Sequence, residues 1–339
     1  MLVLSTGISG SGRDEYLEKV SNYAAKHGKR IKSYNVGDLL LEQAGKIGIH
    51  LTPENVLNAN PAVINSVRSA VFENLSRSLK DDLKKYHAVF VNVHALFYWK
   101  KVFSRAWDNY YVSQLKPDLF VTFIDGAEMV HARLLKRKQW KANPLSFEEI
   151  LLWRNVEVEM TSTIADMEHT FHWIVPVSAP STLLFRLLFK PAMERVYLSM
   201  PITHLVSSTA NRKIDKLRHM LEKHFIVFDP RWVEPGDLSR GKVDPALYNQ
   251  IVARDYYWFI HQSHRLIAYF PKVALSPGLI NEVRETHETN KEVWLIYPKG
   301  EAISPFLTYY CNKIFRSIPE FLKFLAGEMK NKKRKRARR

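Results

Sequence analysis

The stretch AYFPKVALSPGLINEVRETHETNKEV, residues 268–293, predicts a strand, a turn, a helix and a second strand. The turn contains Ser276 and Gly278, and the helix is expected to start near Leu279. This reading puts Glu282 in the first helical turn, where the helix dipole favours a carboxylate. The C-terminal end of a strand, beside a glycine turn, is also the place where α/β sheets commonly hold catalytic groups such as carboxylates. Glu282 is therefore a candidate catalytic residue, although acidic residues are common at this position without a function.

The composition is that of a folded intracellular protein. The chain has 339 residues, enough for two domains, and 46% of them are hydrophobic. The single cysteine, Cys311, excludes an internal disulfide and a multi-cysteine metal site, which fits a cytoplasmic location. The first residues, MLVLSTGISGSG, lack the basic start of a signal peptide, and we find no apolar run long enough to span a membrane.

The positive charge is concentrated at the C-terminus. The net charge is +16, and the last ten residues, KNKKRKRARR, contain eight Lys or Arg. We expect residues 328–339 to form a disordered basic tail, because such a segment cannot bury itself. The tail could bind nucleic acid or another anionic surface, or it could serve only solubility. The sequence does not distinguish these roles.

The first half begins with a glycine-rich loop between a strand and a helix. The strand covers residues 1–6, the loop reads GISGSGRD (7–14), and the helix runs from about 13 to 26. Glycines in such a loop allow backbone N–H groups to converge on a phosphate. Against the pattern G-x-x-x-x-G-K-[ST], Gly7 and Gly12 match, whereas Arg13 and Asp14 occupy the last two positions. Further strands are expected at 31–36, 86–92, 118–124 and 173–176, so residues 1–185 are predicted to form a doubly wound parallel-sheet domain.

Four motifs in this half carry a family resemblance. GISGSGR (7–13), VGDLL (36–40), VHA (93–95) and FVTFIDGAEMVHARLLKRK (120–138) occur in an order that resembles the adenylate kinase and related nucleoside monophosphate kinase family. The resemblance covers about residues 1–180 and implies a P-loop kinase-like domain that uses ATP and Mg²⁺. It implies nucleotide or phosphate contacts at Gly7, Gly10, Gly12, Arg13, Asp38, Arg133, Arg137 and Arg154. The departures at Arg13 and Asp14 affect the catalytic loop itself, so they put phosphoryl transfer in question but not the fold.

The second half is predicted to be a smaller doubly wound domain, residues 193–325. A proline-rich segment, 176–191, leads out of the first domain and places a boundary near residue 190. Strands are expected at 195–199, 224–228, 266–270 and 293–297, with helices at about 209–223 and 245–262. The polar loop around 237–241 is long enough to cover a site.

This half resembles the nucleoside 2-deoxyribosyltransferase family, whose relatives include nucleotide N-glycosidases. The resemblance rests on four features: YLSMPI (197–202), Asp255 on the helix before the apolar strand RLIAYF (265–270), SPG-x-x-x-E (276–282) and KEVWLIY (291–297). It covers about residues 195–300. It implies a Rossmann or flavodoxin-like fold and a reaction without a cofactor. Leu279 and His264 depart from the family pattern, which usually has Thr and a second Asp there.

The resemblance also implies roles for individual residues. Glu282 would be the nucleophile, Asp255 would orient the substrate or protonate the leaving base, and Tyr197 would steer Glu282 or line the sugar site. Ser276 and Gly278 would hold a 5′-phosphate or 5′-hydroxyl, and Pro201 matches the end of the first strand motif. Relatives commonly pair subunits around the site, which leaves a homo-oligomer open.

Three functions follow as hypotheses. The leading one is an enzyme that cleaves or transfers at the N-glycosidic bond of a nucleoside or nucleoside monophosphate, because a carboxylate can capture an oxocarbenium-like state as a glycosyl ester. The second is a nucleoside monophosphate kinase that uses the N-terminal loop. The third is a non-catalytic nucleotide sensor or nucleic-acid-associated protein. The sequence does not decide between hydrolysis and transfer.

Overall fold

The computed structural model describes residues 1–202, 208–233 and 248–337. The chain divides into two compact units, Met1–Leu188 and Phe189–Arg339, and each is described by itself. The predicted fold class is confirmed: both units are α/β, and each contains a five-stranded parallel sheet within the described residues. Among these residues, none of the helices combines the length and the apolar composition needed to cross a membrane.

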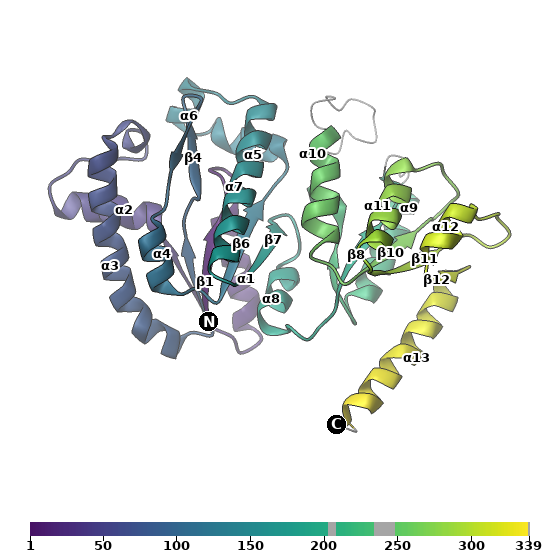
Figure 1. Cartoon of the computed structure of the whole chain (residues 1–339). Coiled ribbons are helices and arrows are strands. Elements are labelled where there is room, and N and C mark those ends of the chain that lie inside the picture. Colours follow the sequence, from purple (N-terminus) through teal and green to yellow (C-terminus); the bar gives the residue numbers. More distant parts are fainter. Residues whose placement is uncertain (203–207, 234–247, 338–339) are drawn as a thin grey trace. The chain divides into compact units, whose positions relative to one another are not determined.

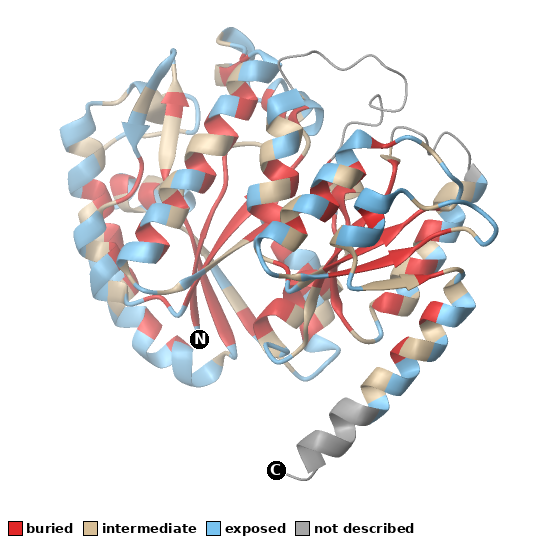
Figure 2. Ribbon diagram, turned by 45° about the vertical axis from the view of Figure 1, so that its right-hand side comes forward, coloured by how far each residue is buried: buried red, intermediate tan, exposed pale blue. Residues whose placement is uncertain are grey.

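The first unit is built on the sheet order β2-β3-β1-β6-β7, and all its strand pairs are parallel (Figure 1). The strands are β1 (Leu2–Thr6), β2 (Ile31–Asn35), β3 (Ala88–Asn92), β6 (Leu119–Ile124) and β7 (Phe171–Pro176). Every residue of β1, β3 and β6 is buried, as expected for parallel strands that are covered by helices on both faces. Figure 2 shows these buried strands beneath helices whose outer sides are exposed.

Eight helices of the described chain belong to this unit. They are α1 (Arg13–Ala25), α2 (Val36–Lys46), α3 (Pro61–Lys85), α4 (Asn109–Leu115), α5 (Ala127–Leu134), α6 (Lys138–Ala142), α7 (Phe147–Met167) and α8 (Ser181–Phe189). The capping box expected at the start of α7 is present, with Ser146 and Glu149 each bonded to the other's backbone N–H. A short antiparallel hairpin, β4 (Leu96–Trp99) and β5 (Val102–Arg105), was not predicted.

The second unit has the sheet order β12-β11-β10-β8-β9. Its strands are β8 (Arg195–Ser199), β9 (Ile226–Phe228), β10 (Arg265–Tyr269), β11 (Glu292–Ile296) and β12 (Lys313–Phe315). In chain order this is the 2-1-3-4-5 arrangement of flavodoxin-like sheets, whose order reverses between β8 and β10. Ligands of such sheets bind at the C-terminal ends of the strands near that reversal.

The helices of this unit differ from the predictions in the π-helical turn at Arg254 and in the start of α11. The helices of the described part of this unit are α9 (Ser208–Leu221), α10 (Tyr248–Ala253), a π-helical turn η6 (Arg254–Ile260), α11 (Pro277–Glu288), α12 (Pro305–Tyr310) and α13 (Ile318–Ala337). The helix predicted for 245–262 is described from Tyr248 and becomes π-helical at Arg254, and the loop around 237–241 lies outside the described residues. Helix α11 begins at Pro277, two residues before the predicted start.

The basic C-terminal segment is helical where disorder was expected. Helix α13 continues through the Lys- and Arg-rich residues to Ala337. Its first turns are anchored by Phe321 and Leu325, which are buried in the core of the second unit. Because Lys and Arg have high helix propensity, an anchored helix extends easily through such residues. Residues 338 and 339 lie outside the described chain.

Candidate functional site

The loop Gly7–Gly12 follows β1 and leads directly into α1. Gly10 and Gly12 have φ values of 80° and 81°, a conformation that residues with a side chain rarely adopt. A Cβ on Gly7 would lie 2.9 Å from the carbonyl oxygen of Phe123, so space also requires glycine there. Helix α1 has no side-chain N-cap, which leaves the N–H groups of its first turn available to an anion. The loop thus has the backbone shape of a phosphate site.

Arg13 and Asp14, the residues that depart from the Walker pattern, bond to each other. Arg13 is only 8% exposed, and its Nη1 donates to the carbonyl oxygen of Val93 at 2.8 Å. Its Nε donates to Asp14 Oδ1 at 3.2 Å, while Asn35 Nδ2 donates to Asp14 Oδ2 at 3.1 Å. Arg13 therefore ties α1 to the end of β3, and its charge is matched by Asp14.

Arg133 lies over the glycine loop, as the family resemblance implies. Its Nη1 donates to the Gly10 carbonyl oxygen at 2.9 Å and to Asp125 Oδ2 at 2.7 Å. A Cβ on Gly12 would lie 3.0 Å from the Arg133 guanidinium carbon. Arg154 Nη1 donates to the carbonyl oxygen of Asp125 at 3.0 Å, so the structure brings both arginines to Asp125. Burial raises the pKa of Asp125, and the hydrogen bond from Arg133 opposes that shift.

Asp38 and Arg137 are the two other positions that the kinase resemblance implies. Asp38 is exposed in the first turn of α2, and the described residues show no contact between it and the loop. Arg137 precedes α6. Burial lowers the pKa of His94, the second residue after β3, and the charges of Arg13 and Arg137 add to that shift. Asp38 and Arg137 remain predicted nucleotide contacts.

Glu157, on α7, is a candidate that the sequence reasoning missed. It is 0% exposed and accepts hydrogen bonds from the N–H groups of Gly7 (3.1 Å), Ala95 (2.8 Å) and Leu96 (3.0 Å). Burial raises its pKa to about 7, and these backbone N–H groups oppose the shift. A carboxylate buried on a helix is unusual, and Trp153 and Thr161 on the same buried face of α7 give the signal that could have identified it.

In the second unit, Tyr197 and Ser199 of β8 both donate to Glu282 of α11. The Tyr197 hydroxyl lies 2.9 Å from Glu282 Oε1, and the Ser199 hydroxyl bonds to Oε2. Asp255 lies beside Tyr197, whose hydroxyl opposes the rise in the Asp255 pKa caused by burial, and it pairs with Arg254 at 2.9 Å. The predicted trio of Tyr197, Asp255 and Glu282 therefore meets at the strand-order reversal. Ser199 and Arg254 are additional members that sequence reasoning did not identify.

The electrostatic reason given for Glu282 needs correction. Because α11 begins at Pro277, Glu282 lies beyond the first turn, and the dipole effect is weak there. The two hydroxyl donors stabilise the carboxylate instead. Burial raises the pKa of Asp255, and the Arg254 cation opposes that rise.

The remaining predicted positions surround α11 and the end of β8. Ser276 Oγ accepts from the Leu279 N–H at 3.4 Å and so caps α11. A Cβ on Gly278 would meet nothing within 4 Å, which leaves space beside the turn. Pro201 is buried just after β8 and before residues 203–207, which are not described. Whether these residues contact a ligand stays a prediction.

Both departures from the family pattern have structural explanations. Leu279 is buried in the core at 2% exposure. His264 precedes β10, at the N-terminal end of the strand, where its Nδ1 accepts from the Arg195 N–H at 3.0 Å. Because Glu282 lies at the other end of the sheet, His264 is not part of that site.

Among the comparisons with known proteins, one family model matches part of the first unit. A family model described as an AAA domain matches residues 6–150. Among solved structures, the crystal structure of TT1252 from Thermus thermophilus is similar, with a TM-score of 0.31 and 11% identity over 52% of this chain and 88% of that chain. The search of curated proteins gave no match. Nothing in these comparisons matches the second unit to deoxyribosyltransferases. The N-terminal unit thus contains a P-loop domain similar to AAA domains, which supports the predicted P-loop and nucleotide binding.

Proposed function

We propose that the unit Met1–Leu188 binds the phosphates of a nucleotide, such as ATP or a nucleoside monophosphate, at the loop Gly7–Gly12. The observation that carries this proposal is the uncapped N-terminus of α1 with the Arg133 guanidinium beside Gly12. Proteins commonly hold phosphate oxygens with the free N–H groups of a helix N-terminus and with guanidinium groups. The match of residues 6–150 to AAA domains supports the same class of ligand.

The proposal concerns binding, because the residues for phosphoryl transfer do not fit. Kinase-type transfer uses Mg²⁺ held by a hydroxyl at the position of Asp14 and a lysine at the position of Arg13. Both carboxylate oxygens of Asp14 already accept hydrogen bonds, from Arg13 and Asn35. The Arg13 guanidinium is held by the Val93 carbonyl. These residues do not form a magnesium site.

Calorimetric titration tests this function. We expect ATP or AMP to bind with and without Mg²⁺, and we expect no ADP to accumulate when both nucleotides are present with Mg²⁺. Absence of heat or of a melting shift with every nucleotide would overturn the binding proposal. Formation of ADP from ATP and AMP would instead assign the kinase activity that the family resemblance implies.

A second candidate function is favoured by the contacts of Glu282. A carboxylate with two hydroxyl donors, next to Asp255 at the strand-order reversal, supports cleavage or transfer at an N-glycosidic bond. In this reaction Glu282 attacks the anomeric carbon, the bond to the base breaks, and the base leaves with a proton from Asp255 or water. Water or a second base then releases the sugar from Glu282.

Release of free base from a panel of nucleosides and nucleoside monophosphates tests this candidate. Glu282→Gln keeps the side-chain size and removes the nucleophile, so we expect it to abolish free base. Glu288→Gln is the matched control, because Glu288 is exposed on the same helix and pairs only with Arg284 in the described residues. Activity that survives in Glu282→Gln would exclude this residue as the nucleophile.

A further inference from the structure

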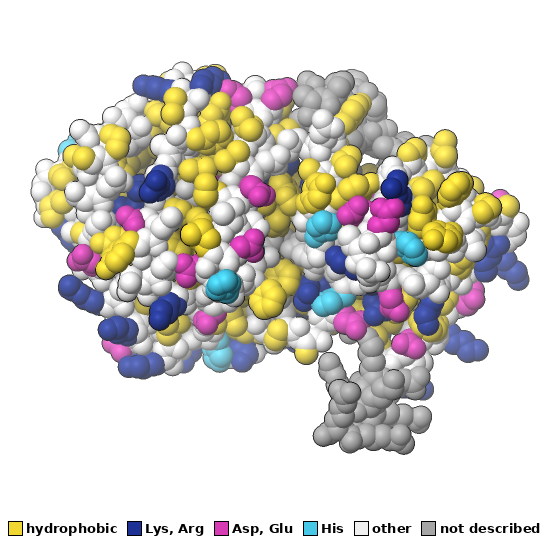
Figure 3. Space-filling model, viewed as in Figure 1, with side chains coloured by type: hydrophobic (Ala, Val, Ile, Leu, Met, Phe, Trp, Pro, Cys, Tyr) yellow, Lys and Arg dark blue, Asp and Glu magenta, His cyan; other side chains and the backbone are white. Residues whose placement is uncertain are grey.

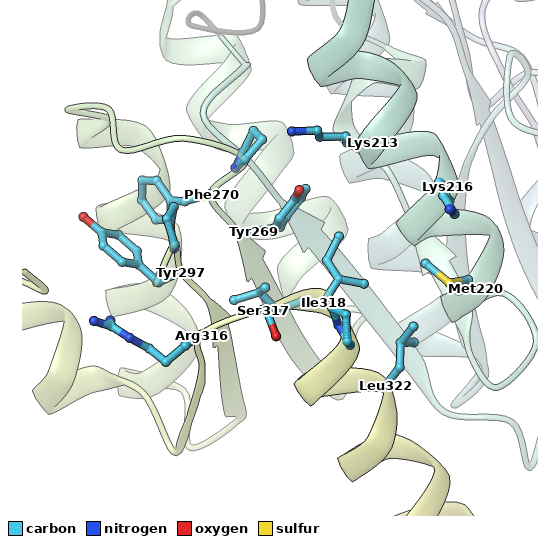
Figure 4. Close-up of a pocket in the computed structure, with 14 residues that line it drawn as sticks. Lys213, Lys216, Met220, Tyr269, Phe270, Tyr297, Arg316, Ser317, Ile318 and Leu322 are labelled. Atoms are coloured by element: carbon cyan, nitrogen blue, oxygen red, sulfur yellow. The ribbon is translucent and has the colours of Figure 1, made fainter. Parts of the chain in front are cut away.

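A cavity of about 540 Å³ lies in the second unit between α9, the start of α13 and the C-terminal ends of β10 and β11 (Figure 4). Cavities of several hundred Å³ at this edge of a parallel sheet are typical of small-molecule sites. Figure 4 shows Lys213 extending from α9, with Tyr269, Phe270 and Tyr297 around the same space. None of the predicted site residues lines this cavity.

The cavity lies on the opposite face of the sheet from Glu282. Tyr197 and Ser199 of β8 point toward Glu282, so Leu198 between them points to the other face. Leu198 belongs to a core cluster that also contains Tyr269 of β10, together with side chains of α9 and α13. Because Tyr269 also lines the cavity, the cavity wall formed by α9 and α13 lies on the face away from Glu282.

The cavity wall is positively charged. Lys213 and Lys216 lie three residues apart on α9, so they share one face of the helix, and Arg316 precedes α13. No Asp or Glu is among the described residues that line the cavity. In the part of the chain that the structure describes, neither lysine forms an ion pair. Such an uncompensated cluster favours an anionic ligand.

Arg316 contributes a donor that the protein itself leaves unused. Its Nη2 donates to the Glu301 carbonyl oxygen at 2.7 Å, whereas Nη1 is buried and has no hydrogen-bond partner among the described residues. The N-terminus of α13 is already satisfied, because Ser317 Oγ accepts from the Glu320 N–H at 3.2 Å. The side chains, rather than this helix end, would therefore hold the ligand.

The rest of the wall suits a flat apolar group. Tyr269, Phe270 and Tyr297 line it with rings that are each at most 6% exposed, and Met220 and Leu322 add flexible apolar contact. Aromatic faces bind planar rings by stacking, while lysine and arginine bind phosphate oxygens. A ligand that combines both features is a mononucleotide.

We propose that this cavity is a mononucleotide site, in which Lys213 and Lys216 bind the phosphate and Tyr269 and Tyr297 contact the base. It is a second ligand site in addition to the loop Gly7–Gly12, and it does not depend on the function assigned to that loop or to Glu282. Its position away from Glu282 suits an effector rather than a substrate.

Photolabelling with 8-azido-AMP tests the proposal in the full chain carrying Arg133→Ala, which weakens binding at the other loop. We expect labelled peptides that contain residues 269–271 or 297–298. The double variant Lys213→Ala/Lys216→Ala should lower this labelling about tenfold or more, since two cationic phosphate contacts are lost. Both lysines are exposed, so their removal should leave folding intact.

The control is Lys223→Ala/Lys323→Ala, which removes the same charge from exposed positions next to α9 and on α13 that do not line the cavity. It should label like the parent. AMP should compete with the label at a lower concentration than adenosine, because the phosphate anchors the ligand. The proposal would be overturned if these peptides carried no label. It would also be overturned if the lysine variant and the control were labelled equally, or if adenosine competed as well as AMP.

Discussion

The Tyr197 hydroxyl donates a hydrogen bond of 2.9 Å to Glu282 Oε1, across 85 residues of chain. The two residues lie on β8 and α11, which meet where the strand order of the second unit reverses. A tyrosine that is fully buried, with its hydroxyl on a carboxylate, fixes that carboxylate in one orientation. The contact thus has consequences for both stability and chemistry.

Tyr197→Phe should destabilise the second unit. The change keeps the ring but removes one donor to a buried carboxylate, and hydrogen bonds to charged groups contribute about 1.5–3 kcal/mol. Urea unfolding followed by a probe in the second unit measures the loss. Tyr257→Phe is the matched control, because Tyr257 is 63% exposed and should change stability by less than about 0.5 kcal/mol. Equal stability of the two variants would show that the Tyr197 bond contributes nothing.

Glu157 should make the stability of the first unit fall between about pH 4.5 and pH 7. Its pKa is raised by burial from 4.5 to about 7 in the folded state. In this interval the unfolded chain has lost the proton while the folded chain keeps it, so stability decreases as pH rises, by up to about 3 kcal/mol. The stabilisation that Glu157 contributes is fully present below the pKa of the unfolded chain and is lost once the pH exceeds about 7.

Glu157→Gln replaces the titrating carboxyl group with an amide that does not titrate. The measurement is the difference in unfolding free energy between the wild type and the variant from pH 4 to 8. Taking the difference cancels the titration of distant groups. We expect the wild type to lose stability relative to Glu157→Gln as pH rises through this range. A difference that does not change with pH would refute the raised pKa, whatever the average cost of the substitution.

The basic C-terminal segment remains a predicted nucleic-acid contact. Figure 3 shows acidic and basic side chains interspersed over the face in view, so charge there is mixed. Removal of residues 330–339 takes away eight cations and spares Phe321 and Leu325, which anchor α13. We expect weaker binding to single- or double-stranded DNA and a flatter dependence of log K on log salt concentration. If the slope of log K against log salt concentration does not change after truncation, the basic segment does not contribute to DNA binding.

The sequence predicted those features that depend on local patterns. The left-handed glycines at Gly10 and Gly12 follow from the loop motif, and the buried strands follow from their apolar runs. The meeting of Tyr197, Asp255 and Glu282 followed from motif order, since parallel strands bring their C-terminal ends to one edge.

Other features depend on tertiary contacts that local patterns do not encode. Glu157 receives its three N–H donors from segments 61 to 150 residues away, and Ser199 meets Glu282 across 83 residues. The helical course of α13 depends on the burial of Phe321 and Leu325, whereas the charge of the segment alone predicted disorder. The self-pairing of Arg13 with Asp14 likewise needed the position of Val93 to be known.

Calorimetric titration of ATP into three proteins tests the central claim, phosphate binding at the loop Gly7–Gly12. Arg133→Ala removes the guanidinium beside Gly12, and the loss of a charged contact to phosphate should weaken binding about tenfold or more. Arg133→Lys keeps the charge and should restore part of the affinity. Arg77→Ala, at an exposed position on α3, should bind like the wild type. If ATP binds Arg133→Ala and the wild type equally well, or binds neither, the loop does not hold nucleotide phosphates as proposed.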